Sequence, residues 1–535
     1  MTDHPAAATV DPPGVAAPER RRWLVLAVLC ASVLVVVLDG TIVNVALPTL
    51  ATELGASTSE LQWIVDAYVL VFAGLLMAAG SLGDRIGRKH VLIAGLALFA
   101  GFSALGATAD SPGALIAWRA AMGVGAALMF PATLAILVNV FTVAKERAVA
   151  IAVWAATAGI AVALGPVTGG WLLEHYWWGS VLMINVPVVA VAIVAIAVLV
   201  PNSRDATIER FDPLGTLLSI GAIGTIVWAV IEGPVHGWTS PTSLVAFGAG
   251  AALLAGFIAW QRHTDHPMLD VSVFTNMRFT AGSVAVTFAF FALMGFVFLV
   301  TQYFQFVRGY GTLEAGVRTV PFAIFTASTA PLSAKLAERV GTKAVVTAGL
   351  VSMAVGFAIS AVTGVATSYW VIVGAMLFLG GGLGLVQAPA TEAIMGSLPP
   401  AKAGVGSAVN DTARELGSTL GVAIVGSVFS SIYAGRLGTA LAGSAVPQDA
   451  VDIAKESVGG AEAVARRAGT QSGPQAQSFI SDAVDHSFIA GWHAGSWVCF
   501  AVVLVGAAVA WRWLPARDSA DDVPTAADDL ELAAA

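Results

Sequence analysis

The segment from Leu82 to Leu96, LGDRIGRKHVLIAGL, returns from Leu336 to Leu350 as LAERVGTKAVVTAGL. Eight of the fifteen aligned positions are identical, and the exchange of Asp84 for Glu338 keeps the negative charge. Any short basic segment between two apolar runs would produce part of this likeness, but here the match continues into the apolar run that follows. The two segments therefore predict an internal repeat, and we expect the chain to contain two related halves.

The composition places those halves in a membrane. The chain has 535 residues, of which 57% are hydrophobic and 11% charged, and its mean hydropathy is +0.82. A water-soluble protein has about 25% charged residues, so this chain has too little polar surface to cover itself in water. We expect an all-α, polytopic membrane protein. Its two cysteines, Cys30 and Cys499, lie in apolar runs and predict neither a disulfide framework nor a metal site.

Apolar runs of the length of a membrane helix recur along the whole chain. About 20 apolar residues are needed to cross the hydrocarbon core, and fourteen such runs can be distinguished. They lie near residues 23–47, 61–82, 90–109, 113–138, 147–172, 179–200, 213–231, 243–260, 280–301, 313–334, 344–363, 369–396, 404–431 and 487–511.

The distribution of basic residues predicts the orientation. The leader, the segments after even-numbered runs and the tail hold eighteen of the 26 Lys and Arg residues. Because such residues concentrate on the cytoplasmic side, we expect both termini in the cytoplasm and the protein in the inner (cytoplasmic) membrane. Both copies of the repeat follow an even-numbered run, so they lie on the same side. The repeat is therefore parallel, an arrangement found in transporters.

These features divide the chain into two six-helix bundles and an insertion. The second run corresponds to the tenth, so two extra helices stand between the halves. The leader is expected to be retained, because no small-residue cleavage site follows it. We expect a cytoplasmic leader at 1–22, a bundle at 23–200, a linker with two inserted helices at 201–260, a cytoplasmic loop at 261–279, a second bundle at 280–513 with a long, mobile extracellular loop at 433–486, and an acidic, disordered tail at 514–535.

Motifs on these runs resemble one family. LDGTIVNVALP in the first run, GSLGDRIGRKHVL after the second, LIAWRAAMGVGAA in the fourth and GIAVALGPVTGG in the fifth occur in that order. From about Arg22 to Arg512 the chain resembles the major facilitator superfamily, specifically its fourteen-helix drug/proton antiporter branch and the QacA-like exporters of quaternary ammonium compounds. The resemblance implies a major facilitator fold, export by alternating access, and the proton motive force in place of any cofactor.

Two of these motifs concern conformational change. The segment after the second run implies a cytoplasmic gate, although its basic residues could serve only to orient the chain. The residues expected in this gating loop are Gly80, Gly83, Asp84, Arg85, Gly87 and Arg88. In the fifth run, small residues allow close helix approach and a proline permits a bend. Ordinary packing is the alternative, and the resemblance favours an antiporter hinge. The residues of this antiporter motif are Gly159, Gly165, Pro166, Gly169 and Gly170.

Carboxylates inside apolar runs form the candidate site. A charge at the bilayer centre costs about 2.5–3.5 kcal/mol on insertion scales. Burial raises the pKa of a carboxyl group and a nearby cation lowers it, so a dehydrated acid can exchange a proton for a cationic substrate. Asp66, in WIVDAY, is the strongest candidate, with an acid that reaches water at a helix end as the alternative. Asp39 resembles an acid found throughout the branch, or else has a helix-packing or gating role through hydrogen bonds to Thr41, Asn44 or the fifth run. Arg119 resembles an arginine that tunes a neighbouring acid, with a structural partner of Asp39 as the alternative.

A second pair of acids lies in the thirteenth run, in NDTARELG. Asp411 and Glu415 are one turn apart and share a helix face, and the family has acids at both positions. Arg414 departs from the family pattern and could pair with Asp411, which would leave Glu415 as the freer acid. The tenth run, FAIFTASTAPL, lacks the acid that QacA has there. Its absence favours monovalent over divalent cations.

The leading hypothesis is a proton-coupled multidrug efflux antiporter for lipophilic, monovalent cations such as quaternary ammonium compounds and cationic dyes. We expect a monomer in the lipid bilayer, without a nucleic-acid partner. Export of an endogenous antibiotic or metabolite is the alternative, and uptake by symport is a weaker one. The eight histidines show no paired ligand spacing, so no enzyme is expected. A sensor would require a soluble output domain and is therefore only a remote alternative. The lack of a phosphate-binding loop argues against an ATP-driven pump.

Overall fold

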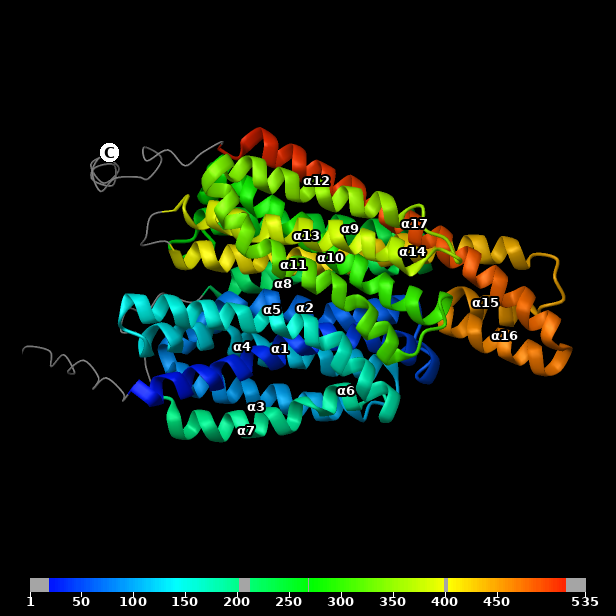
Figure 1. Cartoon of the computed structure of the whole chain (residues 1–535), viewed down its shortest axis with the longest axis horizontal. Coiled ribbons are helices and arrows are strands. Elements are labelled where there is room, and N and C mark those ends of the chain that lie inside the picture. The colour runs from blue at the N-terminus through cyan, green and yellow to red at the C-terminus, as the bar shows by residue number, and fades with distance from the viewer. Residues whose placement is uncertain (1–18, 202–211, 268, 399–402, 516–535) are drawn as a thin grey trace, which may run out of the picture.

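The computed structural model describes residues 19–201, 212–267, 269–398 and 403–515. Within these ranges the chain is helical and contains no strand. The helices run mostly along the long axis of the molecule (Figure 1). The first helix begins and the last helix ends at one end, which we call the terminal end. Two short helices project at the opposite end, which we call the hairpin end. Most of the expected leader and nearly all of the expected acidic tail lie outside the described residues.

The elements fall into the expected groups. The N-terminal bundle consists of α1 (Glu19–Glu53), α2 (Thr58–Ile86), α3 (Arg88–Ala107), α4 (Pro112–Val140), α5 (Ala144–His175), α6 (Ser180–Met183) and α7 (Asn185–Leu199). The inserted pair is α8 (Pro213–His236) and α9 (Pro241–His263). The C-terminal bundle consists of α10 (Met277–Gln302), α11 (Thr312–Val340), α12 (Thr342–Ser360), α13 (Tyr369–Met395), α14 (Ala403–Leu441) and α17 (Pro474–Trp513), with α15 (Gln448–Glu456) and α16 (Val458–Ser472) between the last two.

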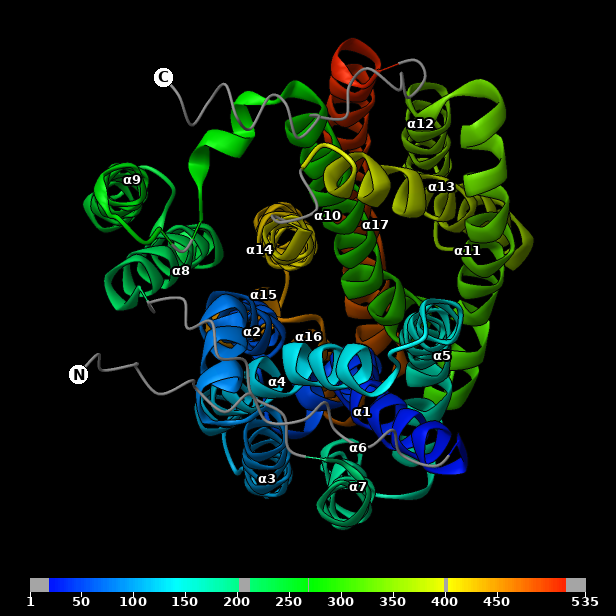
Figure 2. The same cartoon turned by 90° about the vertical axis from the view of Figure 1, so that its left-hand side faces the viewer.

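Twelve helices of the described ranges are long and apolar enough to cross a membrane, with α6 and α7 counted as one span. The helices α5 and α11 have 32 and 29 residues, so they are also long enough. They lie side by side at the junction of the two bundles, as Figure 2 shows from the terminal end. Glu314, Arg318, Lys335, Glu338 and Arg339 lower the hydropathy of α11. With α5 and α11 included the total is fourteen, and this number stays a prediction.

The repeat in the sequence is also a repeat in the backbone. The single residue Gly87 separates α2 from α3, and Gly341 separates α11 from α12. Their dihedral angles are φ 108°, ψ 122° and φ 92°, ψ 149°, a region that residues with a Cβ rarely adopt. Both glycine N–H groups donate to a carbonyl four residues earlier, of Gly83 and Ala337. The same amino acid therefore makes the same turn in both halves.

Helix packing repeats in the same way. A Cβ on Gly95 of α3 would lie 2.8 Å from the carbonyl oxygen of Gly125 in α4. A Cβ on Gly349 of α12 would lie 2.7 Å from the carbonyl oxygen of Gly382 in α13. Such close contacts require glycine, because helix axes can approach this far only where side chains are missing. The two six-helix bundles are thus built on one plan.

Hydrogen bonds join the two bundles at the hairpin end. A hydroxyl or amide group of one bundle donates in each case to a backbone carbonyl of the other. The bonds run from Thr58 to Glu456 (3.0 Å), from Gln62 to Ala423 (2.8 Å), from Thr301 to Asn44 (2.9 Å), from Gln305 to Val45 (3.0 Å) and from Thr312 to Gly170 (3.0 Å). In this conformation the bundles are therefore closed against each other at the hairpin end.

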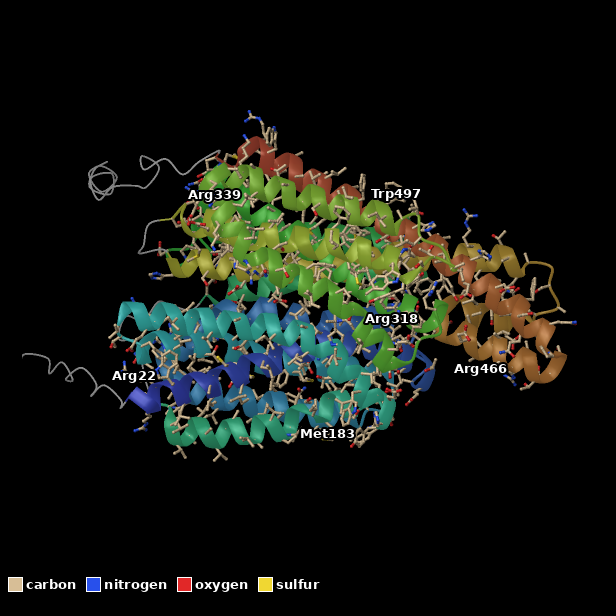
Figure 3. All side chains as sticks on the ribbon, viewed as in Figure 1. Arg22, Met183, Arg318, Arg339, Arg466 and Trp497 are labelled. Carbon is tan, nitrogen blue, oxygen red and sulfur yellow. The ribbon has the colours of Figure 1, made fainter. Side chains whose placement is uncertain are left out.

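The segment 433–486 differs from the expected loop. In place of a loop, α14 continues to Leu441, α15 and α16 follow, and α17 begins at Pro474. Short helices are hard to see in a sequence rich in Ala and Gly with mixed charge, because no long apolar run marks them. Figure 3 labels side chains at both ends of the molecule. Arg22 and Arg339 lie toward the terminal end, whereas Arg318 and Arg466 lie toward the hairpin end.

The run 179–200 also differs from its prediction, because it is broken. Helix α6 ends at Met183 and α7 begins at Asn185, so a single span contains a short interruption. Asn185 is only 1% exposed, which places its amide group inside the N-terminal bundle. The interruption therefore lies next to the Asn185 amide group.

Candidate proton and cation site

Asp39 and Arg119 form a buried ion pair. Asp39 of α1 is 0% exposed and Arg119 of α4 is 1% exposed, and Arg119 Nη1 donates to Asp39 Oδ2. The other carboxylate oxygen accepts from Asn185 Nδ2 at 2.9 Å, and the same amide group contacts Ser103 Oγ at 3.1 Å. Asp39 is therefore bound by groups from α4 and from the start of α7.

The Arg119 guanidinium is held from three directions. Besides the Asp39 contact, its Nε donates to the carbonyl oxygen of Ile64 at 3.0 Å. Its Cζ lies 4.3 Å from the centroid of the Tyr68 ring, within the range of a cation–π interaction. The Tyr68 hydroxyl in turn donates to the carbonyl oxygen of Val36 at 3.3 Å. Such a buried pair is stable only with these additional bonds, because desolvation of two charges is costly.

The alternative role considered for Asp39 does not match its contacts. The Thr41 hydroxyl donates to carbonyl groups of its own helix, at Val37 and Leu38. The Asn44 amide donates to Gly40, also in α1. Asp39 thus relies on Arg119 and Asn185.

Asp66 lies on α2 and has no such partners. It is 0% exposed, and neither carboxylate oxygen has a hydrogen-bond partner among the described residues. Its position on the helix explains the separation from Arg119: that guanidinium contacts the part of α2 around Ile64 and Tyr68, whereas Asp66 follows Gln62 by one turn on another face. Burial at this level also excludes the alternative of an acid that reaches water at a helix end.

The face of α2 that carries Asp66 packs against α14. Gln62 Nε2 donates to the carbonyl oxygens of Val422 at 3.1 Å and Ala423 at 2.8 Å, and contacts Ser427 Oγ at 3.3 Å. On the neighbouring side, Trp63 Nε1 donates to Glu232 Oε1 of α8 at 3.3 Å. The helices α2, α8 and α14 contact one another (Figure 2), so this face of α2 lies where the N-terminal bundle, the C-terminal bundle and the inserted pair meet.

The charged residues of α14, Asp411, Arg414 and Glu415, do not form the ion pair that was considered for them. Arg414 Nη2 contacts Thr391 Oγ1 at 3.4 Å, and its Cζ lies 5.4 Å from the Phe290 ring centroid. Within the part of the chain that the structure describes, Arg414 forms no ion pair with Asp411 or Glu415, and its Nε has no partner. Asp411 is contacted by Asn410 Nδ2 at 3.4 Å. The considered Asp411–Arg414 ion pair is therefore not formed in this conformation.

The expected gating loop is almost entirely helical. Gly80 and Gly83 lie in the last turns of α2, and Gly87 makes the turn already described. Arg88 Nη1 contacts the carbonyl oxygen of Ala135 at 3.4 Å, and Arg85 is exposed. The side chain of Asp84 lies outside the described residues, so the proposed latch stays a prediction.

Four residues of the antiporter motif lie at close helix contacts. A Cβ on Gly169 would lie 2.7 Å from the Ile42 side chain, and one on Gly165 would collide with Thr41, so both glycines face α1. Gly170 faces the backbone at the start of α11, and the Pro166 carbonyl oxygen faces Gly316. Nothing lies within 4 Å of a Cβ on Gly159, so this residue does not join the contact.

Sequence reasoning missed the roles of Asn185 and Tyr68 around this ion pair. The motif MINVP around Asn185 is visible in the sequence, but only the break between α6 and α7 turns the amide toward Asp39. An asparagine two residues before a proline, inside an apolar run, was the available signal.

Comparisons with known proteins agree with this architecture. The model of the Major Facilitator Superfamily matches residues 29–422. The chain is 39% identical over 445 residues to the multidrug efflux pump LfrA of Mycolicibacterium smegmatis, covering 83% of this chain and 88% of LfrA. It is 36% identical over 474 residues to the methyl viologen resistance protein SmvA of Salmonella typhimurium, covering 88% and 93%.

A solved structure shares the fold. The bacterial homolog of the human lysosomal transporter Spinster, in an inward-facing and occupied conformation, superposes with a TM-score of 0.65 at 16% identity. The superposition covers 95% of this chain and 100% of the homolog. Family model, relatives and fold agree: the chain belongs to the major facilitator superfamily of membrane transporters.

Proposed function

We propose that this transporter is a proton-coupled multidrug efflux antiporter that exports lipophilic, monovalent cations by alternating access. It acts as a monomer in the inner membrane with both termini in the cytoplasm. The terminal end then faces the cytoplasm, and the contacts at the hairpin end close the path to the outside. The observation on which the proposal depends is the state of Asp66, a fully buried carboxylate without a partner among the described residues.

A carboxylate in that position needs either a proton or a cation. An ionised group buried without a partner is unfavourable by several kcal/mol, so one of the two must neutralise it. A proton and a cationic substrate cannot both do so, and they therefore compete. Competition at one group, combined with access from one side at a time, is sufficient for exchange.

The Asp39–Arg119 pair has a supporting role in this scheme. Its charges already neutralise each other, so it does not need a substrate. Because Arg119 contacts the backbone of α2 at Ile64, the pair fixes the helix that carries Asp66. Asp411 and Glu415 line the opposing bundle and provide further negative charge near the path of a cation.

The names of the relatives support cationic substrates but not their valence. One is a multidrug efflux pump, and the other confers resistance to methyl viologen, which is a divalent cation. The proposed preference for monovalent cations rests on the segment FAIFTASTAPL of the tenth membrane run, which contains no acid. Export of an endogenous antibiotic or metabolite is the alternative that a substrate panel distinguishes.

The test uses inverted membrane vesicles with the pH gradient and the membrane potential imposed separately. Exchange of one proton for one monovalent cation is electroneutral, so we expect the pH gradient alone to drive uptake of a quaternary ammonium dye. Each additional proton would add about 2.3 kcal/mol per 100 mV of membrane potential. Dye uptake that persists after a protonophore has collapsed both gradients would contradict the proposal.

A further inference from the structure

A small cavity lies between α2, α8 and α14, and one of its lining residues, Leu70, follows Asp66 by one turn of α2. Its volume is about 20 Å³, and the residues around it include Leu70, Ser219, Thr412 and Thr419. About 10–15 Å³ is enough to hold one water molecule when polar partners are available. The cavity is therefore large enough for a water molecule, and its walls supply hydroxyl groups.

Three hydroxyl groups at the cavity are unused by the protein. Thr412 Oγ1 is buried and has no hydrogen-bond partner, and Ser219 and Thr419 donate to no group of the described ranges either. Elsewhere in this bundle, Thr287 and Thr301 bond to carbonyl groups of their own helix, which is the usual arrangement for hydroxyls in membrane helices. Three free hydroxyls around one cavity point to a ligand that is both a donor and an acceptor.

Helix register places Asp66 one turn away from this cavity. The helices α2 and α14 are antiparallel, with Gln62 bonded to Val422 and Ala423. Leu70, one turn after Asp66, lines the cavity together with Thr412. Asp66 lies between these two levels on the same face of α2, one turn before the cavity residue Leu70.

The inserted helix α8 closes the cavity on its outer side. A Cβ on Gly74 of α2 would collide with the Ile220 side chain, so the two helices are in close contact. Without α8, the junction of α2 and α14 would face lipid, in which a polar group has no partner. This position gives the inserted pair a function that neither six-helix bundle provides.

We propose that this cavity holds water and transfers the proton that Asp66 exchanges, with Ser219, Thr412 and Thr419 as its hydrogen-bonding walls. The inference rests on the proposed function. Other titratable groups near the cavity are Glu415, which lies on α14 between the two threonines, and Asp411. On α8 the described ionisable groups are Asp212 at its N-cap and Glu232 and His236 near its other end, away from Ser219.

The experiment compares threonine variants that lose the hydroxyl but keep the shape. The double variant T412V/T419V is reconstituted in liposomes, with T347V as the matched control, because Thr347 also has a buried hydroxyl without a partner but lies on α12. The probe is tetraphenylphosphonium. We expect proton-driven efflux to slow about tenfold in the double variant, while exchange of labelled for unlabelled probe at equal pH, which moves no proton, is unchanged. T347V should leave both rates unaltered.

Three results would overturn parts of the account separately. If the double variant behaves as T347V while D66N abolishes proton-driven efflux, the cavity has no role and the proposed function stands. If D66N itself transports normally, the proposed function fails. An equal loss of efflux and exchange in the double variant indicates a structural defect and also rejects the proton role. Should the double variant not reach the membrane, S219A is measured in the same two assays, with the same criteria.

Discussion

Asp39 and Asp66 are the same amino acid, 27 residues apart in the sequence, both 0% exposed within one bundle. Their surroundings differ completely. Asp39 is bound by the Arg119 guanidinium and the Asn185 amide, whereas neither oxygen of Asp66 has a partner among the described residues. The comparison shows that a charge in a membrane helix can serve two purposes. A satisfied carboxylate holds helices together, and an unsatisfied one is available to a ligand.

The largest effect is expected from Asp66→Asn, which keeps the shape and removes the exchangeable proton. Proton-driven export of a monovalent cation should fall by about three orders of magnitude, or to the background of the assay. Because no bond to Asp66 is lost, the protein should remain in the membrane at the normal level, as judged by immunoblot. Efflux that stays intact and pH-dependent in this variant would remove Asp66 from the mechanism.

Asp39→Asn should lower the stability of the protein, whereas Asp66→Asn should affect transport. It leaves the Arg119 charge buried and unpaired, which costs about 3–5 kcal/mol of stability. We expect a marked decrease in the thermal unfolding temperature in detergent, whereas Asp66→Asn should not lower it. Equal unfolding temperatures for the two variants would show that the difference in their surroundings has no energetic consequence.

Asn185→Ala tests the remaining bond to Asp39. The loss of a hydrogen bond to a charged group should cost about 1.5–3 kcal/mol, so the decrease in unfolding temperature should be smaller than that of Asp39→Asn. Asn44→Ala is the matched control, because that amide bonds only within its own helix. A larger effect in the control than in Asn185→Ala would place the stabilisation of α1 elsewhere.

Gln62→Leu should produce the smallest effect, by weakening the closed hairpin end beside Asp66. The loss of its bonds to α14 is worth about 1 kcal/mol, or roughly a fivefold change in the ratio of closed to open forms. Labelling of a cysteine placed at Val45 by an impermeant maleimide should therefore become faster. Gln302→Leu is the control, since the buried Gln302 bonds to Phe298 in its own helix. Equal labelling in the two variants would contradict this role of Gln62.

The sequence predicts the architecture well because the architecture is local and repeated. Apolar runs mark most of the helices, and the copies around Gly87 and Gly341 establish the two halves. The hairpin α15–α16 was not foreseen, since its short helices have no apolar run. The partners of the charges are predicted only in part: a pair of Arg119 with Asp39 is one alternative for Arg119 in the sequence, whereas the contact of Asn185 with Asp39 is not predicted. Whether Arg119 meets Asp39 or Asp66 depends on helix register and on the break before Asn185, and neither is encoded near the acids themselves.

The most direct test is to count the protons released when substrate binds. Purified protein in weakly buffered detergent solution is mixed with tetraphenylphosphonium, and a pH-indicator dye reports the release. The account predicts that the unmodified protein and Asn44→Ala release protons on binding, and that Asp66→Asn binds the cation without releasing any. Undiminished release from Asp66→Asn would show that the exchanged proton resides on another group, and the central claim would be wrong.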